Sequence, residues 1–186
     1  MRCKKLFEYE VQSPRQIAYL CPMELDSVQT VAFTGHRTYN GKSDTALFAM
    51  VQQLYDEGFR NFMSGMAVGF DLAAAAAVVI LRNLHPDVRL VCAVPFEGQE
   101  RRFSSTDKAR YCALLAQANE VIYLCENYCP ECYALRNNLL VDCATVIVAW
   151  FDGSAGGTRQ TVQRARRVGL RIENLWIDPQ QKLPGL

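Results

Sequence analysis

The sequence lacks any apolar run of the roughly 20 residues that a membrane-spanning helix requires. No apolar segment follows the charged start at residues 1–5, so the sequence offers no secretory signal peptide. Basic and acidic side chains nearly balance, at 20 against 19, and the net charge of +1 excludes a strong general field for polyanions. These absences predict a cytoplasmic protein that makes no membrane contact.

The chain has little need of disulfides, because 186 residues, half of them hydrophobic, suffice for a sizeable core. Cys125, Cys129 and Cys132 nevertheless have the C-x-x-x-C-x-x-C spacing of radical-SAM iron–sulfur enzymes. Those enzymes have the motif after the first strand of a larger barrel, whereas here it follows a late strand and no fourth ligand is evident. The sequence therefore favours incidental buried thiols or adventitious zinc, and we predict no metal site and no required cofactor.

Strand-like and helix-like patterns alternate from residue 30 onward. Repeated βα units predict an α/β fold, namely a Rossmann-like three-layer α/β/α arrangement with a mostly parallel sheet. Residues 1–29, with an edge-like strand at 6–11, are interpreted as an N-terminal extension packed on a main ligand-binding domain of residues 30–186. The predicted strands are 31–33, 61–63, 88–94, 120–124, 145–151 and 170–177, and the predicted helices are 45–56, 73–81, 106–117, 133–142 and 157–168.

The stretch 143–169 contains a strand, a glycine loop and the start of a helix. The loop at 152–157 includes Gly153, Gly156 and Gly157, which permit positive φ and remove side chains that would keep a ligand away. The first amides of a helix have no internal partner and lie at the positive end of its dipole, so such a start binds phosphate. Thr158 adds a hydroxyl donor. A tight turn alone is the alternative explanation of these glycines.

Three other loops also follow predicted strands, at 34–37, 64–71 and 95–97. In parallel sheets, ligands bind at the carboxyl ends of the strands. We therefore expect all four loops to open onto one edge of the sheet and to surround a common ligand.

Five segments, in the order TGHR, SGMAVGFDLAAA, PFEGQ, RNNLLVDCA and DGSAGGT, resemble the YpsA-like family of the SLOG superfamily of Rossmann-like proteins. The resemblance covers about residues 30–177. It implies binding of a nucleotide or nucleotide-derived molecule, of the adenine nucleotide, NAD or ADP-ribose class, by a sensing or regulatory domain. The ligand-binding positions that it implies are Gly35, His36, Arg37, Ser64, Gly65, Gly69, Asp71, Arg136, Asn137, Gly156, Gly157 and Thr158, and the strand-end loops add Pro95, Glu97, Asp152 and Gly153.

Several of these residues have chemistry that suggests a role. Arg37 and Arg136 are candidates to pair with phosphate, because a guanidinium group matches it bidentately. Asp71 is a candidate to bind a ribose hydroxyl, or else an early-turn carboxylate favoured by the helix dipole. His36 is either a ligand contact or a hydrogen-bonded structural histidine.

Catalysis is a weaker alternative. The related LOG phosphoribohydrolases use a glutamate three residues after the threonine of their glycine motif, and Thr161 stands there in this sequence. Without that carboxylate the attacking water loses its partner, so phosphoribohydrolase activity of this type is not expected. Glu97 and Asp71 are the carboxylates that another N-glycosidic hydrolysis would use.

A second functional hypothesis is single-stranded nucleic-acid binding of the kind found in DprA. This protein belongs to the same superfamily, and segment 64–71 resembles the corresponding part of it. Such binding needs a basic groove with aromatic platforms. Apart from the last helix, the local cationic cluster is Arg101, Arg102, Lys108 and Arg110. The near-neutral net charge weighs against this hypothesis, and assembly into a homo-oligomer stays open.

Overall fold

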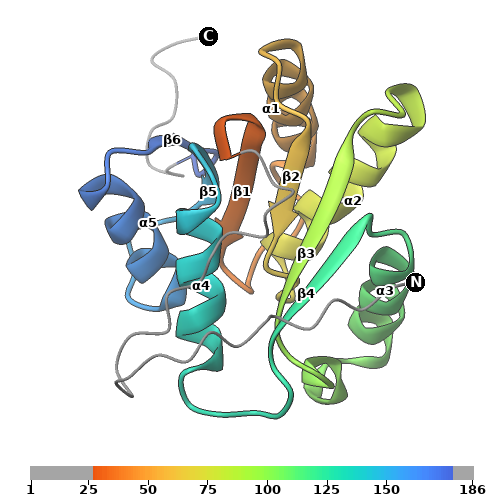
Figure 1. Cartoon of the computed structure of the whole chain (residues 1–186), viewed down its shortest axis with the longest axis vertical. Coiled ribbons are helices and arrows are strands. Elements are labelled where there is room, and N and C mark those ends of the chain that lie inside the picture. The colour runs from red at the N-terminus through yellow and green to blue at the C-terminus, as the bar shows by residue number, and fades with distance from the viewer. Residues whose placement is uncertain (1–26, 178–186) are drawn as a thin grey trace, which may run out of the picture.

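The computed structural model describes residues 27–177, in which strands and helices alternate (Figure 1). The expected strand at 6–11 lies outside this range, and the division into 1–29 and 30–186 stays a prediction. Within 27–177 no helix combines the length and apolarity needed to cross a membrane.

The elements are η1 (Ser27–Gln29), β1 (Thr30–Gly35), α1 (Asp44–Asp56), β2 (Asn61–Ser64), α2 (Phe70–Leu84), β3 (Arg89–Phe96), η2 (Gln99–Arg102), α3 (Ser105–Ala116), β4 (Glu120–Cys125), α4 (Cys132–Asp142), β5 (Val146–Trp150), α5 (Gly157–Arg167) and β6 (Arg171–Asn174).

The strands form one six-stranded sheet in the order β4-β3-β2-β1-β5-β6, and every adjacent pair is parallel. The Rossmann-like prediction is thus confirmed. Strand β1 lies between β2 and β5, so the chain builds the sheet outward from β1 in opposite directions. Such a reversal leaves a crevice beyond the carboxyl ends of the two strands that flank it. The fold therefore places a crevice at the ends of β1 and β5.

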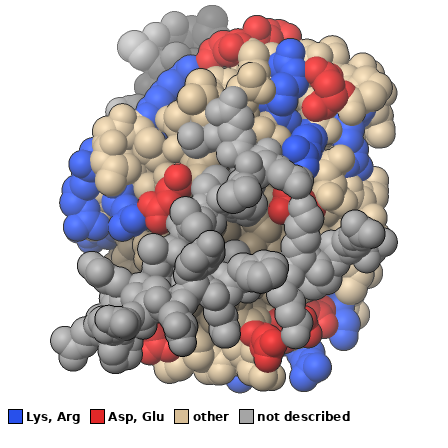
Figure 2. Space-filling view, in the orientation of Figure 1, with Lys and Arg blue, Asp and Glu red and all other residues tan. Residues whose placement is uncertain are grey.

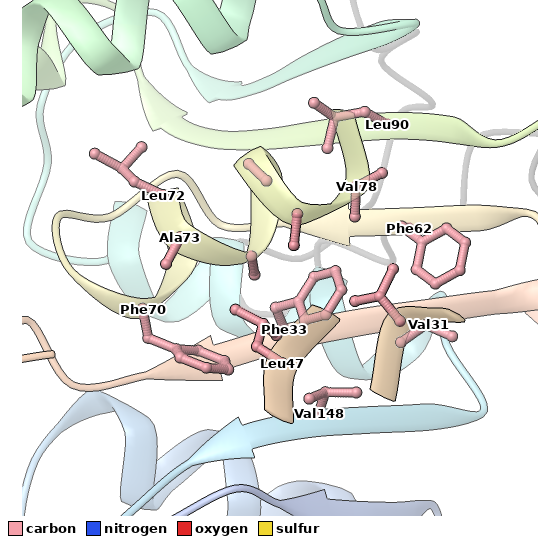
Figure 3. Packing of buried hydrophobic residues seen from close by; sticks show 14 of the residues in the cluster. Val31, Phe33, Leu47, Phe62, Phe70, Leu72, Ala73, Val78, Leu90 and Val148 are labelled. Carbon is pink, nitrogen blue, oxygen red and sulfur yellow. The ribbon is translucent and has the colours of Figure 1, made fainter. Parts of the chain in front are cut away.

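The two faces of the sheet are covered by different helices. Val31 and Phe33 pack in a cluster with α1, α2 and α3, whereas Ala32 packs with α4 and α5, because successive side chains of a strand point to opposite faces. Figure 3 shows the first cluster, in which Phe33 meets Leu47 of α1 near Phe70 of α2. Complete burial of one such side chain stabilises the fold by roughly 1.5–3 kcal/mol.

Helix α2 begins at Phe70, three residues before the alanine-rich segment from which it was predicted. The preceding residue, Gly69, has φ +89°, and a Cβ there would lie 2.6 Å from the carbonyl oxygen of Arg37. Only glycine fits this position. The close approach brings the loop after β1 directly against the start of α2, and so assembles part of the crevice.

Candidate functional site

A cavity of about 310 Å³ lies at the carboxyl ends of β1 and β5. This volume is at the lower end of the range for small-molecule sites. Four segments far apart in the sequence contribute to its wall: the end of β1, the loop before α2, the first turns of α4 and the start of α5. The lining residues are Thr34, Gly35, His36, Arg37, Ala67, Asp71, Tyr133, Arg136, Asn137, Gly157 and Thr158.

The start of α5 presents unpaired backbone amides to this cavity. The amide of Gln160 donates to the carbonyl of Gly156 at 3.2 Å, which is the first intrahelical bond. The amides of residues 157–159 have no acceptor in the part of the chain that the structure describes, and no side chain caps the helix. Such amides, at the positive end of the helix dipole, favour an anion.

Side-chain donors surround this helix start. A Cβ at Gly157 would lie 3.4 Å from Nδ2 of Asn137, so the Asn137 amide is directly beside the helix terminus. Thr158 is largely buried at the same terminus. Arg37 is exposed, and its Cζ lies 5.8 Å from the ring centroid of Tyr133. Arg37 forms no ion pair with any residue between 27 and 177.

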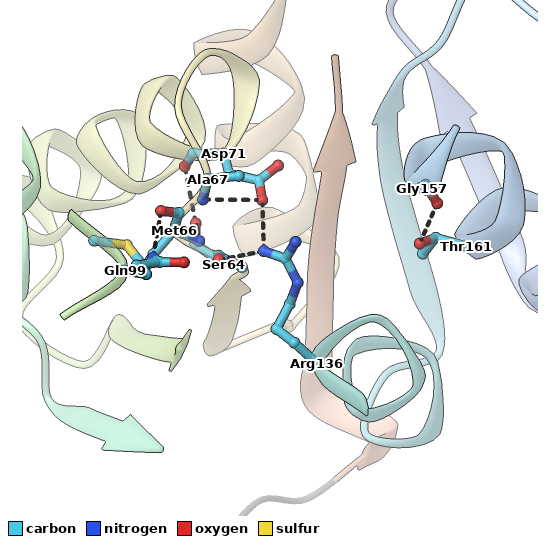
Figure 4. A network of polar contacts seen from close by, with 9 residues as sticks. Ser64, Met66, Ala67, Asp71, Gln99, Arg136, Gly157 and Thr161 are labelled. Atoms are coloured by element: carbon cyan, nitrogen blue, oxygen red, sulfur yellow. Dashed lines mark hydrogen bonds and ion pairs between the residues drawn. The ribbon is translucent and has the colours of Figure 1, made fainter. Parts of the chain in front are cut away.

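A buried ion pair, which Figure 4 shows, lines the cavity. Nη1 of Arg136 lies 3.3 Å from Oδ2 of Asp71, and the side chains are 8% and 5% exposed. The same Nη1 donates to the carbonyl of Gly65, and the amide of Ala67 donates to Oδ2 of Asp71 at 3.4 Å. Asp71 thus fixes the guanidinium group of Arg136 through Oδ2, whereas its buried Oδ1 has no hydrogen-bond partner in the part of the chain that the structure describes. A contact between Asp71 and a ribose hydroxyl stays a prediction.

Burial dominates the electrostatics of this pair. Burial raises the pKa of Asp71 to about 6, even though Arg136 and the nearby amides of Ala67 and Gly35 favour the charged carboxylate. Burial likewise lowers the pKa of Arg136, against the attraction of Asp71. Because both charges lose hydration, the pair is costly unless each group keeps its partner.

The raised pKa of Asp71 predicts that the free energy of unfolding depends on pH. The folded pKa of about 6 exceeds the ordinary value of 3.8, so the folded state binds this proton more tightly than the unfolded state. The resulting stabilisation is complete below about pH 4 and is lost as the pH rises through about 6. Relative to Asp71→Asn, the free energy of unfolding of the wild type therefore falls by up to about 3 kcal/mol across this window.

Urea unfolding of the two proteins from pH 4 to pH 7 measures this difference. Asp152→Asn is a control of opposite sign, because hydrogen bonds from Ser154 lower the pKa of Asp152. A wild-type minus Asp71→Asn difference that stays flat, or that rises with pH, contradicts the assignment.

Ser64, Gly65 and Gly69 shape the loop before α2 and do not line the cavity. The hydroxyl of Ser64 donates to the carbonyl of Asp71 at 2.8 Å and accepts from the amide of Met66 at 3.2 Å. A Cβ at Gly65 would collide with the guanidinium group of Arg136. These small residues therefore allow the Arg136 side chain to reach its partners.

His36 connects the loops that follow β1 and β5. Its Nε2 lies 2.8 Å from Oδ1 of Asp152 and 3.3 Å from the Asp152 amide nitrogen. Its ring packs against Trp150 and Phe151, with centroid distances of 6.0 and 5.7 Å. This geometry favours the structural alternative for His36, although the ring also borders the cavity.

The remaining predicted residues lie away from the cavity lining. Pro95 is buried within β3, and Glu97 is exposed beyond its end. Gly153 and Gly156 are exposed in the loop that leads to α5. Tyr133 lines the cavity without having been predicted, whereas Thr34 and Ala67 belong to the loops 34–37 and 64–71 that were expected to surround a ligand.

Carboxylates are scarce at this cavity. Asp71 is the sole acidic residue among those of the described chain that line it, and it is engaged by Arg136. Thr161, at the position of the LOG glutamate, is 1% exposed and donates its hydroxyl to the carbonyl of Gly157 at 3.0 Å. The arrangement suits anion binding.

Comparisons with known proteins find relatives of this chain. The YpsA family model, described as the YspA SLOG family, matches residues 32–171. The SPbeta prophage-derived protein YoqJ of Bacillus subtilis strain 168 is 32% identical over 143 residues, which are 70% of this chain and 83% of YoqJ.

Two solved structures share the fold. DNA processing protein A (DprA) from Streptococcus pneumoniae has a TM-score of 0.59 at 18% identity, covering 78% of this chain and 49% of that one. DprA from Helicobacter pylori, whose structure concerns a single-stranded DNA binding mode, has a TM-score of 0.58 at 16% identity, covering 80% and 65%. The chain thus spans about half of the pneumococcal protein and less than two thirds of the other, and at these identities the likeness concerns the fold.

Proposed function

This chain belongs to the YpsA (YspA SLOG) family, and from that premise we propose that its cavity binds a nucleotide or a nucleotide-derived small molecule. The uncapped start of α5 supports this most strongly, because its free amides open onto the same cavity as Arg37 and Arg136. A phosphate group accepts hydrogen bonds from amides and pairs with guanidinium, so the three features suit one anion.

Aromatic side chains beside the cavity favour a nucleotide over inorganic phosphate. Tyr133 lies with its ring centroid 5.9 Å from that of Phe96, and Phe96 lies 5.4 Å from Tyr128. Arg37, which we propose contacts the phosphate, is also close to the Tyr133 ring, so the aromatic cluster lies beside the proposed phosphate site. Aromatic and guanidinium planes stack on nucleobases. We propose the adenine nucleotide, NAD or ADP-ribose class as ligand, and sensing or regulation as the role.

Binding without turnover fits the site best. Hydrolysis of an N-glycosidic bond needs a carboxylate that can act on water or on the developing charge. Asp71 is held by Arg136, and Glu97 lies outside the cavity lining. Product analysis after prolonged incubation with nucleoside phosphates and NAD tests this part: released base or ribose phosphate would contradict it.

Thermal-shift titrations with AMP, ADP, ATP, NAD and ADP-ribose test the proposal. We expect at least one of them to raise the Tm of ligand-free protein, since a ligand that binds only the folded state stabilises it. Arg37→Ala should change the Tm of the free protein little, because this exposed side chain loses only its approach to the Tyr133 ring there. The variant should weaken binding about tenfold, or about 1.4 kcal/mol, through the lost ligand contact.

Arg166→Ala is the matched control, because Arg166 is an exposed arginine in the last turn of α5, far along the helix from the cavity. Its affinity should equal that of the wild type. If no member of the panel shifts the Tm, or if both arginine variants weaken binding equally, the proposed site is wrong.

Single-stranded nucleic acid is the second candidate ligand, and an exposed aromatic platform supports it. Tyr128 is 57% exposed, and Cζ of Arg102 lies 5.9 Å from its ring centroid. The other members of the predicted cationic cluster, Arg101, Lys108 and Arg110, are exposed as well. However, Figure 2 shows small groups of Lys and Arg interspersed with Asp and Glu on the visible described part of this face, in keeping with the net charge of +1.

Filter binding of a single-stranded oligonucleotide at low salt separates the two candidates. Retention that Tyr128→Ala and Arg102→Ala abolish would favour nucleic acid as the ligand. Absence of retention at micromolar protein, together with a nucleotide-dependent rise in Tm, would favour the small molecule.

A further inference from the structure

Three cysteine sulfurs meet at the start of α4. Cys125 ends β4, Cys132 begins α4, and Cys129 lies in the turn between them. Sγ of Cys129 is 3.6 Å from Sγ of Cys125 and 2.8 Å from Sγ of Cys132, and all three sulfurs lie within 4.8 Å of one another. Cys132 is completely buried and the other two are partly buried. All three are free thiols.

The 3.6 Å separation of the Cys125 and Cys129 sulfurs suits two ligands of one metal ion, whereas the 2.8 Å separation of the Cys129 and Cys132 sulfurs must widen by about 1 Å when an ion binds. In a tetrahedral site with metal–sulfur bonds of about 2.3 Å, ligand sulfurs lie about 3.8 Å apart. The thiolates of a four-iron cluster bind different iron atoms and must therefore lie farther apart. The cluster of three sulfurs is thus too compact for the iron–sulfur chemistry that its sequence spacing suggests.

The backbone around Cys132 favours negative charge on its sulfur. The amide of Cys129 donates to Sγ of Cys132 at 2.9 Å. Cys132 is the first residue of α4, so its sulfur lies at the positive end of the helix dipole, which stabilises negative charge. Soft thiolate ligands select zinc or a similarly thiophilic ion.

We propose that Cys125, Cys129 and Cys132 bind a single thiophilic metal ion of the zinc class. No other histidine, cysteine, aspartate or glutamate of residues 27–177 belongs to the group, so the remaining coordination positions are filled from outside it. The ion fixes the turn between β4 and α4, because it holds the last residue of the strand against the first residue of the helix.

The ion also supports the cavity described above. Tyr128 directly precedes Cys129, and Tyr133 directly follows Cys132. Arg136 and Asn137 lie one turn farther along α4 and line the cavity. If the proposed nucleotide site is correct, removal of the ion weakens nucleotide binding by loosening the start of α4. The metal site itself does not depend on that proposal.

Metal analysis of the untagged full-length protein, purified with a reductant and without chelators, is the first test. We expect about one zinc-class ion per chain, retained through gel filtration. Cys129→Ser with Cys132→Ser should retain none, whereas Cys112→Ser, which changes an exposed cysteine of α3, should retain the ion in full.

Cobalt reconstitution of the wild type tests the site even if the double variant fails to fold. Co²⁺ bound by three thiolates gives tetrahedral d–d bands and sulfur-to-metal charge transfer, which stoichiometric Zn²⁺ should displace. Lack of stoichiometric Zn²⁺ or Co²⁺ binding would overturn the proposal. Two other results would also overturn it: equimolar iron and sulfide in protein prepared anaerobically, or a Cys129–Cys132 disulfide that persists in reductant. The metal measurements contain no nucleotide, so their outcome does not depend on the nucleotide proposal. A protein that binds the ion but binds no nucleotide in the thermal-shift titrations would contradict only the nucleotide proposal.

Discussion

Replacement of Gly157 by aspartate is expected to abolish nucleotide binding without loss of the fold. A Cβ at this position meets only Nδ2 of Asn137, at an ordinary 3.4 Å, so a side chain is accommodated. A carboxylate at the first turn of α5 stabilises the helix through its dipole. The same carboxylate places a negative charge where we propose the phosphate binds. We expect affinity to fall at least about 100-fold, or about 2.7 kcal/mol, in a thermal-shift or calorimetric titration.

Gly157→Ala is the matched control, because it adds the Cβ without the charge. It should keep most of the affinity and have a Tm close to that of the wild type. The interpretation would be wrong if alanine and aspartate weakened binding equally, since the effect would then be steric and not electrostatic.

Arg136→Met should destabilise the protein more than any other change proposed for the cavity. Removal of the guanidinium group leaves Asp71 buried without its cation and the carbonyl of Gly65 without its donor. Breaking a buried pair in this way costs about 3–5 kcal/mol, which corresponds to a fall in Tm of roughly 10 °C for a chain of this size. Binding of nucleotide should be lost as well.

A double variant separates charge burial from the loss of packing. Arg136→Met with Asp71→Asn removes both charges, so it should be more stable than Arg136→Met alone at pH 7, while nucleotide binding stays absent. The deficit of Arg136→Met should also shrink at pH 5, where an unpaired Asp71 is protonated. Strictly additive losses of stability in the double variant would contradict the pairing of these two residues.

The sequence was sufficient to predict the sheet and the start of α5. Apolar β-branched segments that alternate with amphipathic segments require a parallel sheet covered on both faces. The glycines before residue 158 marked where β5 gives way to α5, and the uncapped helix start is at that place. Tyr133 could have been predicted too, because it lies three and four residues before Arg136 and Asn137 and so shares their helix face.

Other features depend on contacts between distant segments. The Asp71–Arg136 pair joins residues 65 positions apart, and neither pattern nor spacing shows that they meet. Glu97 follows a strand, yet it is exposed beyond the end of β3, outside the cavity lining, because being near a strand end does not fix the direction of a side chain. The spacing of the cysteines is consistent with an iron–sulfur cluster, incidental thiols or adventitious zinc, and the proposal of a site for one ion depends on the distances between the sulfurs.

The central claim is that a phosphate group binds the free amides at the start of α5. A titration of isotopically labelled protein with AMP, followed through its backbone amide resonances, tests this directly. We expect the largest shifts at Gly157, Thr158 and Arg159, because these amides gain a hydrogen-bond acceptor. If AMP binds and these three resonances stay in place while others move, the account is wrong.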